Sequence, residues 1–473
     1  MKYDDEKLIM VVGSGLTGLM CALKLKLLNL KKTIIIIERE SKIGGLYSGL
    51  SKISGIDFDH GMHLIYTSCN KEIDDLYKKI LPLKEWHIYE GNKKDIAGIF
   101  YNGSLQEYSQ YIDLRSHPLK DQKTYTKSFY SSVKNAKNKK FSNALEYLDN
   151  QFGKKIVNKI HGPILKRLFG ISLDKLDLIS TRSPPLDRII LFDTEPMLKL
   201  MKSKKLRARI AFPDQLNLPP IRENDQKGMY PKKFGMTHFI QKFENLLKSL
   251  NIEILTNTNI SSIETVKNKI TNVNLVINNL KKRTIKIERI LWTAGWPGIA
   301  KLLNVDISDL RFDKGPQIIF LNIVFDKPID TGSLYHFFCY DEGFITHRVT
   351  NYNNYCPASS KVGKFPVSIE IWPSKNLKLS SSKISEKKLL KIALNELKQF
   401  GVIDSSYKVV DAKMESGVTN FPMPSLTNAN SLSKIRQRVK NKRIGNIKIA
   451  GVMAEKGLFF LPETLNDAFS KLR

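Results

Sequence analysis

The sequence predicts an α/β protein in which a domain built on a parallel sheet is interleaved with an α+β domain that contains a mainly antiparallel sheet and a helical insertion. Three observations favour this architecture. Two apolar runs flank a helical segment in the first forty residues, helical patterns dominate from Glu72 to about Leu206, and strand-like runs recur from Pro316 to Val409. With 473 residues, the chain has room for about three domains.

The first forty residues read as a βαβ unit. Leu8–Val12 is a continuous apolar run, 16–28 has the composition of a buried helix, and a second β-branched run covers 33–37. Uninterrupted apolar strands are typical of a parallel sheet that helices cover on both faces.

The middle and last parts of the chain supply the remaining elements. Helices are expected at 142–151 and 154–168, with Gly153 and Gly170 as breaks, and the proline-containing stretch 213–225 is interpreted as a crossing between domains. Further helices are expected at 236–250 and after Pro462, and strands at 252–255, 270–277, 289–292, 318–325, 344–350, 367–372 and 446–452.

This order suggests two discontinuous domains. We expect residues 1–70, 226–305 and 425–473 to form a nucleotide-binding domain, and residues 71–225 and 306–424 to form a substrate domain with the helical insertion.

The charge balance is strongly basic, with 76 Lys and Arg against 46 Asp and Glu, a formal net charge of +30. Such a surplus favours anionic partners, for example phosphate-bearing substrates, acidic lipid surfaces or nucleic acid. The basic residues are scattered, however, and the densest run, 434–443, reads as a solvated loop or helix face. We therefore expect no specific nucleic-acid partner.

Other features indicate the compartment. No uncharged run approaches the ~20 residues of a membrane-spanning helix, which predicts a soluble, cytoplasmic protein and leaves contact with a membrane surface open. The four cysteines lie far apart, without CxxC or metal-ligand spacing, and this favours a reducing compartment without a metal site. The oligomeric state is not indicated.

A glycine motif follows the first predicted strand. Gly13-Ser14-Gly15-Leu16-Thr17-Gly18 has the GxGxxG spacing of a Rossmann-type dinucleotide site, in which the backbone approaches a pyrophosphate at a helix N-terminus. Glu38 ends the second strand, where a carboxylate accepts the ribose hydroxyls and disfavours a 2′-phosphate. Strand, glycines, helix and acid together predict a dinucleotide site.

A second glycine pair and a histidine-containing segment extend this motif. Gly44-Gly45 follows Glu38, and Asp59-His60-Gly61-Met62-His63 comes soon after. Here the sequence resembles the flavin-containing amine oxidase superfamily, above all its protoporphyrinogen-oxidase-like and UDP-galactopyranose-mutase-like members. The family's opening pattern is matched by Gly13, Gly15, Gly18, Glu38, Gly44, Gly45, Asp59, Gly61 and His63.

Weaker similarities follow in the same order as in the family, at 101–103, 152–170, 230–236 and 290–295. Two positions depart from the pattern: Leu46 stands where many members carry Arg, and Val452 follows Gly451 where an acidic residue is usual.

The resemblance implies FAD as a non-covalent cofactor. The final helix after Pro462 would aim its N-terminal amides at the flavin, with ordinary packing as the alternative. The cofactor contacts that the resemblance implies are Gly13, Ser14, Gly15, Leu16, Thr17, Gly18, Glu38, Arg39, Gly44, Gly45, Leu46, Gly61, Met62, His63, Ala294, Gly295, Gly451 and Leu461.

Two residues are candidates for a catalytic role. His63 would lie beside the flavin in the resemblance, where it could tune the cofactor or orient substrate; a histidine that bonds a nearby carbonyl is the alternative. Arg348, in a segment similar to the family's R-V-T-N-x-x-x-Y, could clamp a carboxylate or phosphate if it points inward. The alternative is an arginine on a solvated face.

Three functions are compatible with these features. The first is an FAD-dependent oxidoreductase of the amine oxidase or protoporphyrinogen oxidase type, whose flavin accepts a hydride from a small-molecule substrate. The second is a flavin-dependent isomerase similar to UDP-galactopyranose mutase, which would suit an anionic nucleotide-sugar substrate. The third is a basic surface protein that binds nucleic acid or acidic membrane and has an inactive cofactor site.

Overall fold

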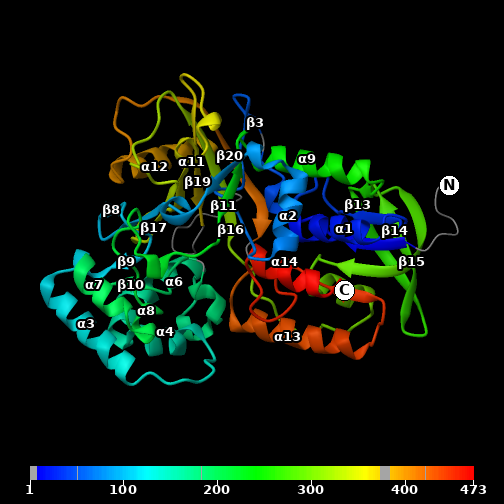
Figure 1. The fold of residues 1–473 in the computed structure, drawn as a ribbon, viewed down its shortest axis with the longest axis horizontal. Helices are drawn as coiled ribbons and strands as arrows, with labels where there is room; N and C mark the ends of the chain where they lie inside the picture. Colours follow the sequence, from blue (N-terminus) through cyan, green and yellow to red (C-terminus); the bar gives the residue numbers. More distant parts are fainter. Residues whose placement is uncertain (1–7, 51, 183, 373–383, 421, 473) are drawn as a thin grey trace.

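In the computed structural model two seven-stranded sheets organise the chain, and a helical insertion lies beside them (Figure 1). The structure describes residues 8–50, 52–182, 184–372, 384–420 and 422–472. Residues 1–7, the start of the expected nucleotide-binding domain, lie outside the described residues.

The first sheet has a parallel core and an antiparallel extension. Its strand order is β12-β2-β1-β15-β14-β13, and β21 also pairs with β15. All pairs formed by β1, β2, β12 and β21 are parallel, whereas β13, β14 and β15 form an antiparallel meander. The bounds are β1 Leu8–Val12, β2 Ile34–Ile37, β12 Glu253–Leu255, β13 Thr258–Val266, β14 Lys269–Ile277, β15 Lys281–Trp292 and β21 Ile447–Ile449.

Strand β15 connects the two parts because it changes partners along its length. Residues 281–286 pair with β14, and residues 287–292 pair with β1. The sequence pattern predicted only the last four residues of this strand, because the first half is charged and lies partly in solvent.

Helices cover both faces of the parallel core. Helices α1 (Leu16–Leu28) and α14 (Leu461–Ser470) share a hydrophobic core with one face of β1 and β2. Helices α10 (Trp296–Leu302) and α13 (Leu426–Asn441) share a second core with the other face. Both faces are therefore buried, and this explains the uninterrupted apolar runs of β1 and β2.

The second sheet has the order β20-β16-β19-β18-β17-β7-β8, with one parallel pair, β17 with β7. Helix α12 (Glu386–Gln399) packs on one face, where Glu396 accepts hydrogen bonds from the N–H groups of Ile345 and Thr346. The bounds are β7 Ala97–Tyr101, β8 Ser104–Gln106, β16 Gln317–Phe325, β17 His336–Cys339, β18 Thr346–Asn351, β19 Phe365–Ile371 and β20 Val409–Asn420.

The helical insertion begins later than the sequence pattern predicted. Residues 86–106 carry strands β6, β7 and β8, so the helical region starts at α3 and does not extend back to Glu72. Strand β6 pairs with β11 in a small antiparallel sheet that also contains β5. Strand β6 is short and carries half-exposed aromatic residues, so its sequence shows no clear alternation of apolar and polar residues.

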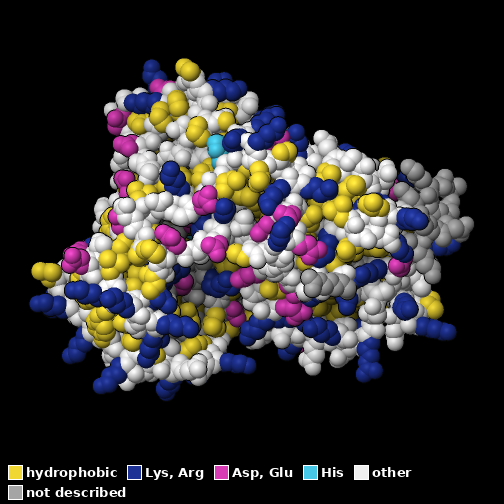
Figure 2. Space-filling model, in the orientation of Figure 1, with side chains coloured by type: hydrophobic (Ala, Val, Ile, Leu, Met, Phe, Trp, Pro, Cys, Tyr) yellow, Lys and Arg dark blue, Asp and Glu magenta, His cyan; other side chains and the backbone are white. Residues whose placement is uncertain are grey.

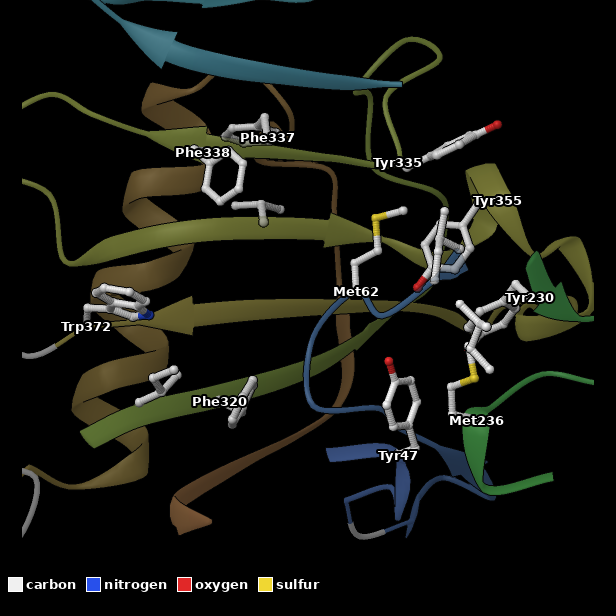
Figure 3. Close-up of a cluster of buried hydrophobic side chains, with 14 of the residues drawn as sticks. Tyr47, Met62, Tyr230, Met236, Phe320, Tyr335, Phe337, Phe338, Tyr355 and Trp372 are labelled. Carbon is white, nitrogen blue, oxygen red and sulfur yellow. The ribbon is translucent and has the colours of Figure 1, made fainter. Parts of the chain in front are cut away.

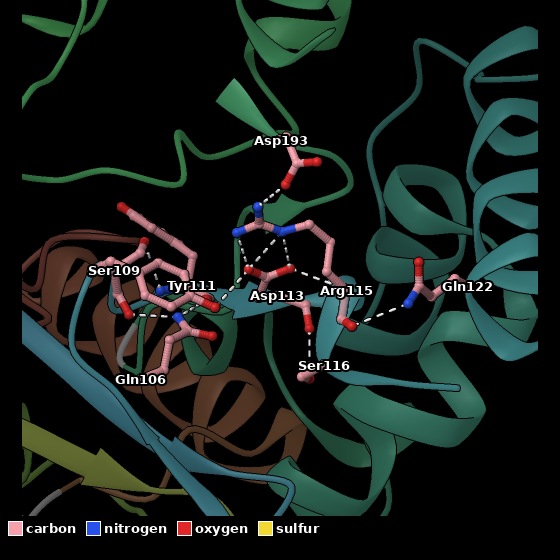
Figure 4. Close-up of polar contacts among 9 residues, drawn as sticks. Gln106, Ser109, Tyr111, Asp113, Arg115, Ser116, Gln122 and Asp193 are labelled. Atoms are coloured by element: carbon pink, nitrogen blue, oxygen red, sulfur yellow. Dashed lines mark hydrogen bonds and ion pairs between the residues drawn. The ribbon is translucent and has the colours of Figure 1, made fainter. Parts of the chain in front are cut away.

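The helices of the insertion lie together at the lower left of Figure 1, below the second sheet. The expected helix at 154–168 contains a π-helical turn at Val157–His161, next to Pro163, which has no N–H to continue the α-helical ladder. Arg115 ties the start of the insertion to Asp113 and Asp193 (Figure 4). The helices are α3 Leu119–Lys134, α4 Ala144–Phe152, α5 Lys154–Ile156, α6 Gly162–Phe169, α7 Thr194–Met201 and α8 Lys204–Arg207.

Shorter elements complete the chain: β3 Lys52–Ile53, β4 Ile56–Asp57, β5 Ile65–Tyr66, α2 Lys71–Ile80, β6 Trp86–Tyr89, β9 Ile112–Asp113, β10 Ile189–Ile190, β11 Gly228–Pro231, α9 Met236–Ser249 and α11 Tyr352–Tyr355. Within the described ranges, no helix has the length and apolar character needed to cross a bilayer. The four cysteines are free, and Cys21 is buried in α1.

Candidate functional site

The predicted glycine turn lies between β1 and α1, at the carboxyl edge of the parallel strands. Gly13 has a φ of +96°, which favours glycine, and Gly15 is the N-cap of α1. Ligands of open parallel sheets bind at this edge, where helix N-terminal amides point outward.

The three glycines of the motif have different surroundings. A β-carbon at Gly18 would lie 2.1 Å from the carbonyl oxygen of Gly13, and one at Gly13 would lie 2.6 Å from Thr293 Oγ1. A β-carbon at Gly15 would meet no heavy atom within 4 Å. Gly13 and Gly18 thus serve close packing, whereas the space in front of Gly15 is open.

Glu38 faces the same turn from the end of β2. Its Oε2 accepts hydrogen bonds from Ser14 N–H at 2.8 Å and from Ser14 Oγ at 2.6 Å, and its Oε1 accepts one from Glu40 N–H at 2.8 Å. Arg39 is exposed and forms an ion pair with Glu40. The carboxylate therefore lies beside the glycine backbone, and Arg39 points away from it toward Glu40.

The second glycine pair packs directly on the first motif. Gly44 N–H donates to the Ser14 carbonyl at 2.9 Å, and a β-carbon at Gly45 would lie 3.3 Å from the Gly15 Cα. Leu46 is half exposed, and its carbonyl oxygen lies 3.1 Å from His60 Nδ1. The two glycine motifs thus form one continuous backbone surface.

Residues from two further strand ends reach the same edge. Ala294 and Gly295 follow β15, Gly451 follows β21, and a β-carbon at Gly451 would lie 3.5 Å from the Thr293 carbonyl oxygen. Leu461 is the first residue of α14, whose Thr464 Oγ1 lies 3.3 Å from Thr17 Oγ1 in α1. All of these predicted positions therefore surround the carboxyl ends of β1, β2, β15 and β21.

The segment 58–63 links this edge to the second sheet. Buried Asp59 accepts hydrogen bonds from Tyr230 Oη at 2.5 Å and from Met236 N–H at 2.9 Å, at the start of α9. Burial raises the pKa of Asp59 to about 6, and the two hydrogen bonds oppose that rise. Asp59 thus fixes the segment to the N-terminus of α9.

Gly61 and His63 meet the second sheet. A β-carbon at Gly61 would lie 1.9 Å from Glu370 Oε1 and 3.0 Å from Arg348 Nη2. Met62 is buried, and His63 Nδ1 lies 3.4 Å from the Gly61 carbonyl oxygen. Burial and the positive charge of Arg348 lower the pKa of His63 to about 3, so its imidazole is neutral near pH 7.

Arg348 points inward from β18, but a carboxylate already holds it. Its Nε and Nη2 donate to Glu370 Oε1 at 2.6 and 2.5 Å, and both side chains are largely buried. Glu370 was not a sequence candidate, although a single acid within the apolar run of β19 could have indicated it. The arginine is therefore half of an internal ion pair.

Aromatic side chains line the same face of the second sheet. Figure 3 shows Phe320, Phe338 and Trp372 on this face, with Met62 and Tyr47 in front of it. The His60 ring contacts Phe320 at 5.8 Å between centroids, which supports this placement. Among the described residues, no cluster of three or more His, Cys, Asp or Glu side chains is arranged to hold a metal ion.

Comparisons with known proteins agree with this geometry. Residues 11–80 match the model of the NAD(P)-binding Rossmann-like domain. The structure resembles reduced UDP-galactopyranose mutase with a TM-score of 0.75 and 14% identity, over 99% of this chain and 93% of the other. At this identity the likeness is one of fold.

Two further solved structures have a similar fold. A protoporphyrinogen oxidase-like protein from Exiguobacterium sp. 255-15 has a TM-score of 0.67 and 15% identity, over 99% of this chain and 98% of the other. Wild-type putrescine oxidase bound to putrescine has a TM-score of 0.61 and 10% identity, over 98% of each chain. No curated protein matches the sequence.

The match to the Rossmann-like domain model covers some of the predicted site residues and not others. Residues 11–80 include both glycine motifs, Glu38 and segment 58–63, whereas Arg348 and Gly451 lie outside the match. The tertiary fold brings these distant segments together.

Proposed function

We propose that this protein is an FAD-dependent oxidoreductase that binds its flavin non-covalently and oxidises a small-molecule substrate. The observation that carries the proposal is the continuous surface formed by Gly13–Gly18, Gly44 and Gly45, with the Glu38 carboxylate beside it. The proposal includes the division into a discontinuous cofactor domain and a substrate domain.

The residues present fit a dinucleotide. The open space in front of Gly15 would admit a pyrophosphate, which the α1 N-terminus and its dipole would stabilise. Oε1 of Glu38 accepts one hydrogen bond, from Glu40 N–H, and keeps a second lone pair that would accept a ribose hydroxyl, whereas Oε2 already accepts two bonds from Ser14. When bound, FAD supplies a two-electron acceptor that takes a hydride from the substrate and passes the electrons to an external acceptor.

His63, Arg348 and Gly61 would contribute hydrogen bonding, charge and positioning around the bound cofactor. His63 is neutral near pH 7, so it would serve as a hydrogen-bonding group near the cofactor and not as a cation. Arg348 would place a positive charge beside segment 61–63, with its geometry fixed by Glu370. Gly61 holds this segment against the ion pair because any side chain there would collide with Glu370.

A flavin-dependent mutase is the second candidate, and the similarity to reduced UDP-galactopyranose mutase favours it. Such an enzyme would be active only with reduced flavin and would consume no electron acceptor. Turnover under anaerobic conditions, with and without an added acceptor, distinguishes the two reactions.

The cofactor assignment can be tested by the absorbance spectrum of the purified protein. We expect the two flavin bands, and release of the chromophore on acid precipitation. Gly15→Val should remove the colour while the protein stays folded, because a β-carbon there would meet no protein atom within 4 Å and would project into the space assigned to the cofactor.

Gly445→Val is the matched control. Gly445 is exposed whereas Gly15 is half-buried, but like Gly15 it has no positive φ, and its β-carbon would lie 3.9 Å from the nearest atom, the Asn268 carbonyl oxygen. This variant should keep its flavin. Full flavin occupancy in Gly15→Val, or its loss in both variants, would contradict the assigned site.

A further inference from the structure

A β-bulge in β18 places two consecutive polar side chains on one face of the second sheet. Thr346 pairs with Ile371, but Arg348 pairs with the next residue, Glu370, so His347 is an extra residue. The Glu396 carboxylate binds Thr346 N–H from the α12 side. The His347 ring, by contrast, contacts Phe338 and Trp372 on the opposite face, beside Arg348.

The apolar ring of Phe338 lies at the centre of a group of polar side chains. Its ring centroid lies 5.2 Å from His336, 5.4 Å from His347 and 6.1 Å from Tyr340, and 5.6 Å from the Arg348 Cζ. We call these residues the Phe338 cluster: His336, Phe338, Tyr340, His347 and Arg348. It surrounds one apolar ring with several hydrogen-bonding groups.

Three polar atoms of the Phe338 cluster have no hydrogen-bond partner within the described structure. They are His336 Nδ1, His347 Nδ1 and Tyr340 Oη, in side chains that are 6%, 4% and 2% exposed. A buried polar atom without a partner costs about 1 to 3 kcal/mol. Three such atoms around one ring indicate a site in which a ligand supplies the missing hydrogen-bond partners.

The charges around the cluster are balanced. Glu370 neutralises Arg348, and the field of Arg167 is opposed by buried Glu396. Burial, together with the positive charge of Arg348, lowers the pKa of both His336 and His347 well below the ordinary value. Each of these two arginines therefore has a nearby carboxylate that offsets its charge.

We propose that the Phe338 cluster binds the substrate, and that the substrate is an uncharged planar molecule that offers hydrogen-bonding groups to His336, His347 and Tyr340. This inference rests on the proposed flavoenzyme function and narrows its substrate class. It argues against the anionic clamp that an inward, unpaired Arg348 would have formed. A charged group here would lose its hydration without a free counter-charge.

Two probes of the same shape test this inference. Benzamide and benzoate differ mainly in charge, and their binding to the flavin-loaded protein can be measured by calorimetry and by the change in the flavin spectrum. We expect saturable benzamide binding, with benzoate at least about tenfold weaker, because one lost hydrogen bond or unpaired charge changes affinity by that factor. Equal or tighter binding of benzoate, or no binding of benzamide, would overturn the proposal.

Variants then locate the binding. His347→Ala and His336→Ala should each weaken benzamide binding about tenfold while the flavin spectrum stays that of the wild type. His117→Ala is the control, because His117 lies just before α3, beside Tyr125 and outside the Phe338 cluster. Unchanged benzamide affinity in both cluster variants would refute this site. Protein without flavin would instead refute the proposed function, and calorimetry would still report whether benzamide binds.

Discussion

At the scale of single residues, burial gives Asp59 an acid–base property that its sequence context did not indicate. The side chain is 1% exposed, and burial raises its pKa to about 6, above the usual value of about 3.9 for an aspartate. The folded protein therefore binds this proton more tightly than the unfolded chain does. This proton contributes its full stabilisation of the fold below the pKa that Asp59 has in the unfolded chain. The contribution is lost as pH rises through the pKa that Asp59 has in the folded protein.

Asp59→Asn isolates this effect, because the amide cannot titrate but can still bond Tyr230 and Met236. We expect the unfolding free energy of the wild type, relative to this variant, to fall by about 2 kcal/mol between about pH 4 and about pH 7. Urea unfolding at several pH values measures the difference. A difference that is constant across this range would contradict the raised pKa.

At the scale of elements, one arginine joins the helical insertion to the second sheet. Arg167 in α6 donates to three carbonyl oxygens at one end of β17 and β18, those of Cys339 at 2.5 Å, Phe344 at 2.9 Å and Thr346 at 2.8 Å. The insertion otherwise continues as a separate group of helices (Figure 1). Arg167, together with the Phe169 ring that lies 5.9 Å from the Trp372 ring between centroids, holds α6 against this end of the second sheet.

Replacing Arg167 with Met keeps the length of the side chain but leaves three partly buried carbonyls without this donor. We expect a loss of about 3 kcal/mol in unfolding free energy and faster proteolysis within the insertion, since bonds from a charged donor are worth about 1.5 to 3 kcal/mol and do not add fully. Lys166→Met, at the exposed neighbouring position, should change neither property. Equal stability of the two variants would show that other contacts hold the insertion.

At the scale of the whole molecule, the positive charge is not gathered into one patch on the face that Figure 2 shows. Figure 2 shows Lys and Arg side chains interspersed with Asp and Glu on the visible face. Within the basic run 434–443, Arg438 pairs with Asp309, and Lys440 lies 3.7 Å from Glu455. Acidic residues of the same chain therefore offset part of the positive charge of this run.

Cofactor binding should stabilise the molecule as a unit, because the candidate contacts come from segments at both ends and in the middle of the chain. With free FAD at about 100 times its Kd, linkage predicts about 2.7 kcal/mol of stabilisation and a rise of about 3 °C in Tm for a chain of this length. Calorimetry of the flavin-depleted protein with and without added FAD measures this shift. Gly15→Val should show no rise, and a rise in that variant would point to a different binding position.

The sequence by itself determined the local units. Continuous apolar strands, the glycine turn and the acid at the end of β2 specify a βαβ unit, because each depends on residues that are close in the chain. Short or half-exposed strands such as β6 and β13 were missed, since their polar surface hides the alternation that reveals a strand. The N-terminal half of β15 was lost for the same reason.

Only the tertiary structure decided which side chains of distant segments contact one another. Glu370 lies in another strand, and no pattern around Arg348 shows that this acid neutralises its charge. The bulge that turns His347 toward Phe338 is likewise a property of the pairing between strands. Side-chain contacts and burial between distant segments set the charge and hydrogen-bonding state of a site, and these quantities are absent from local sequence.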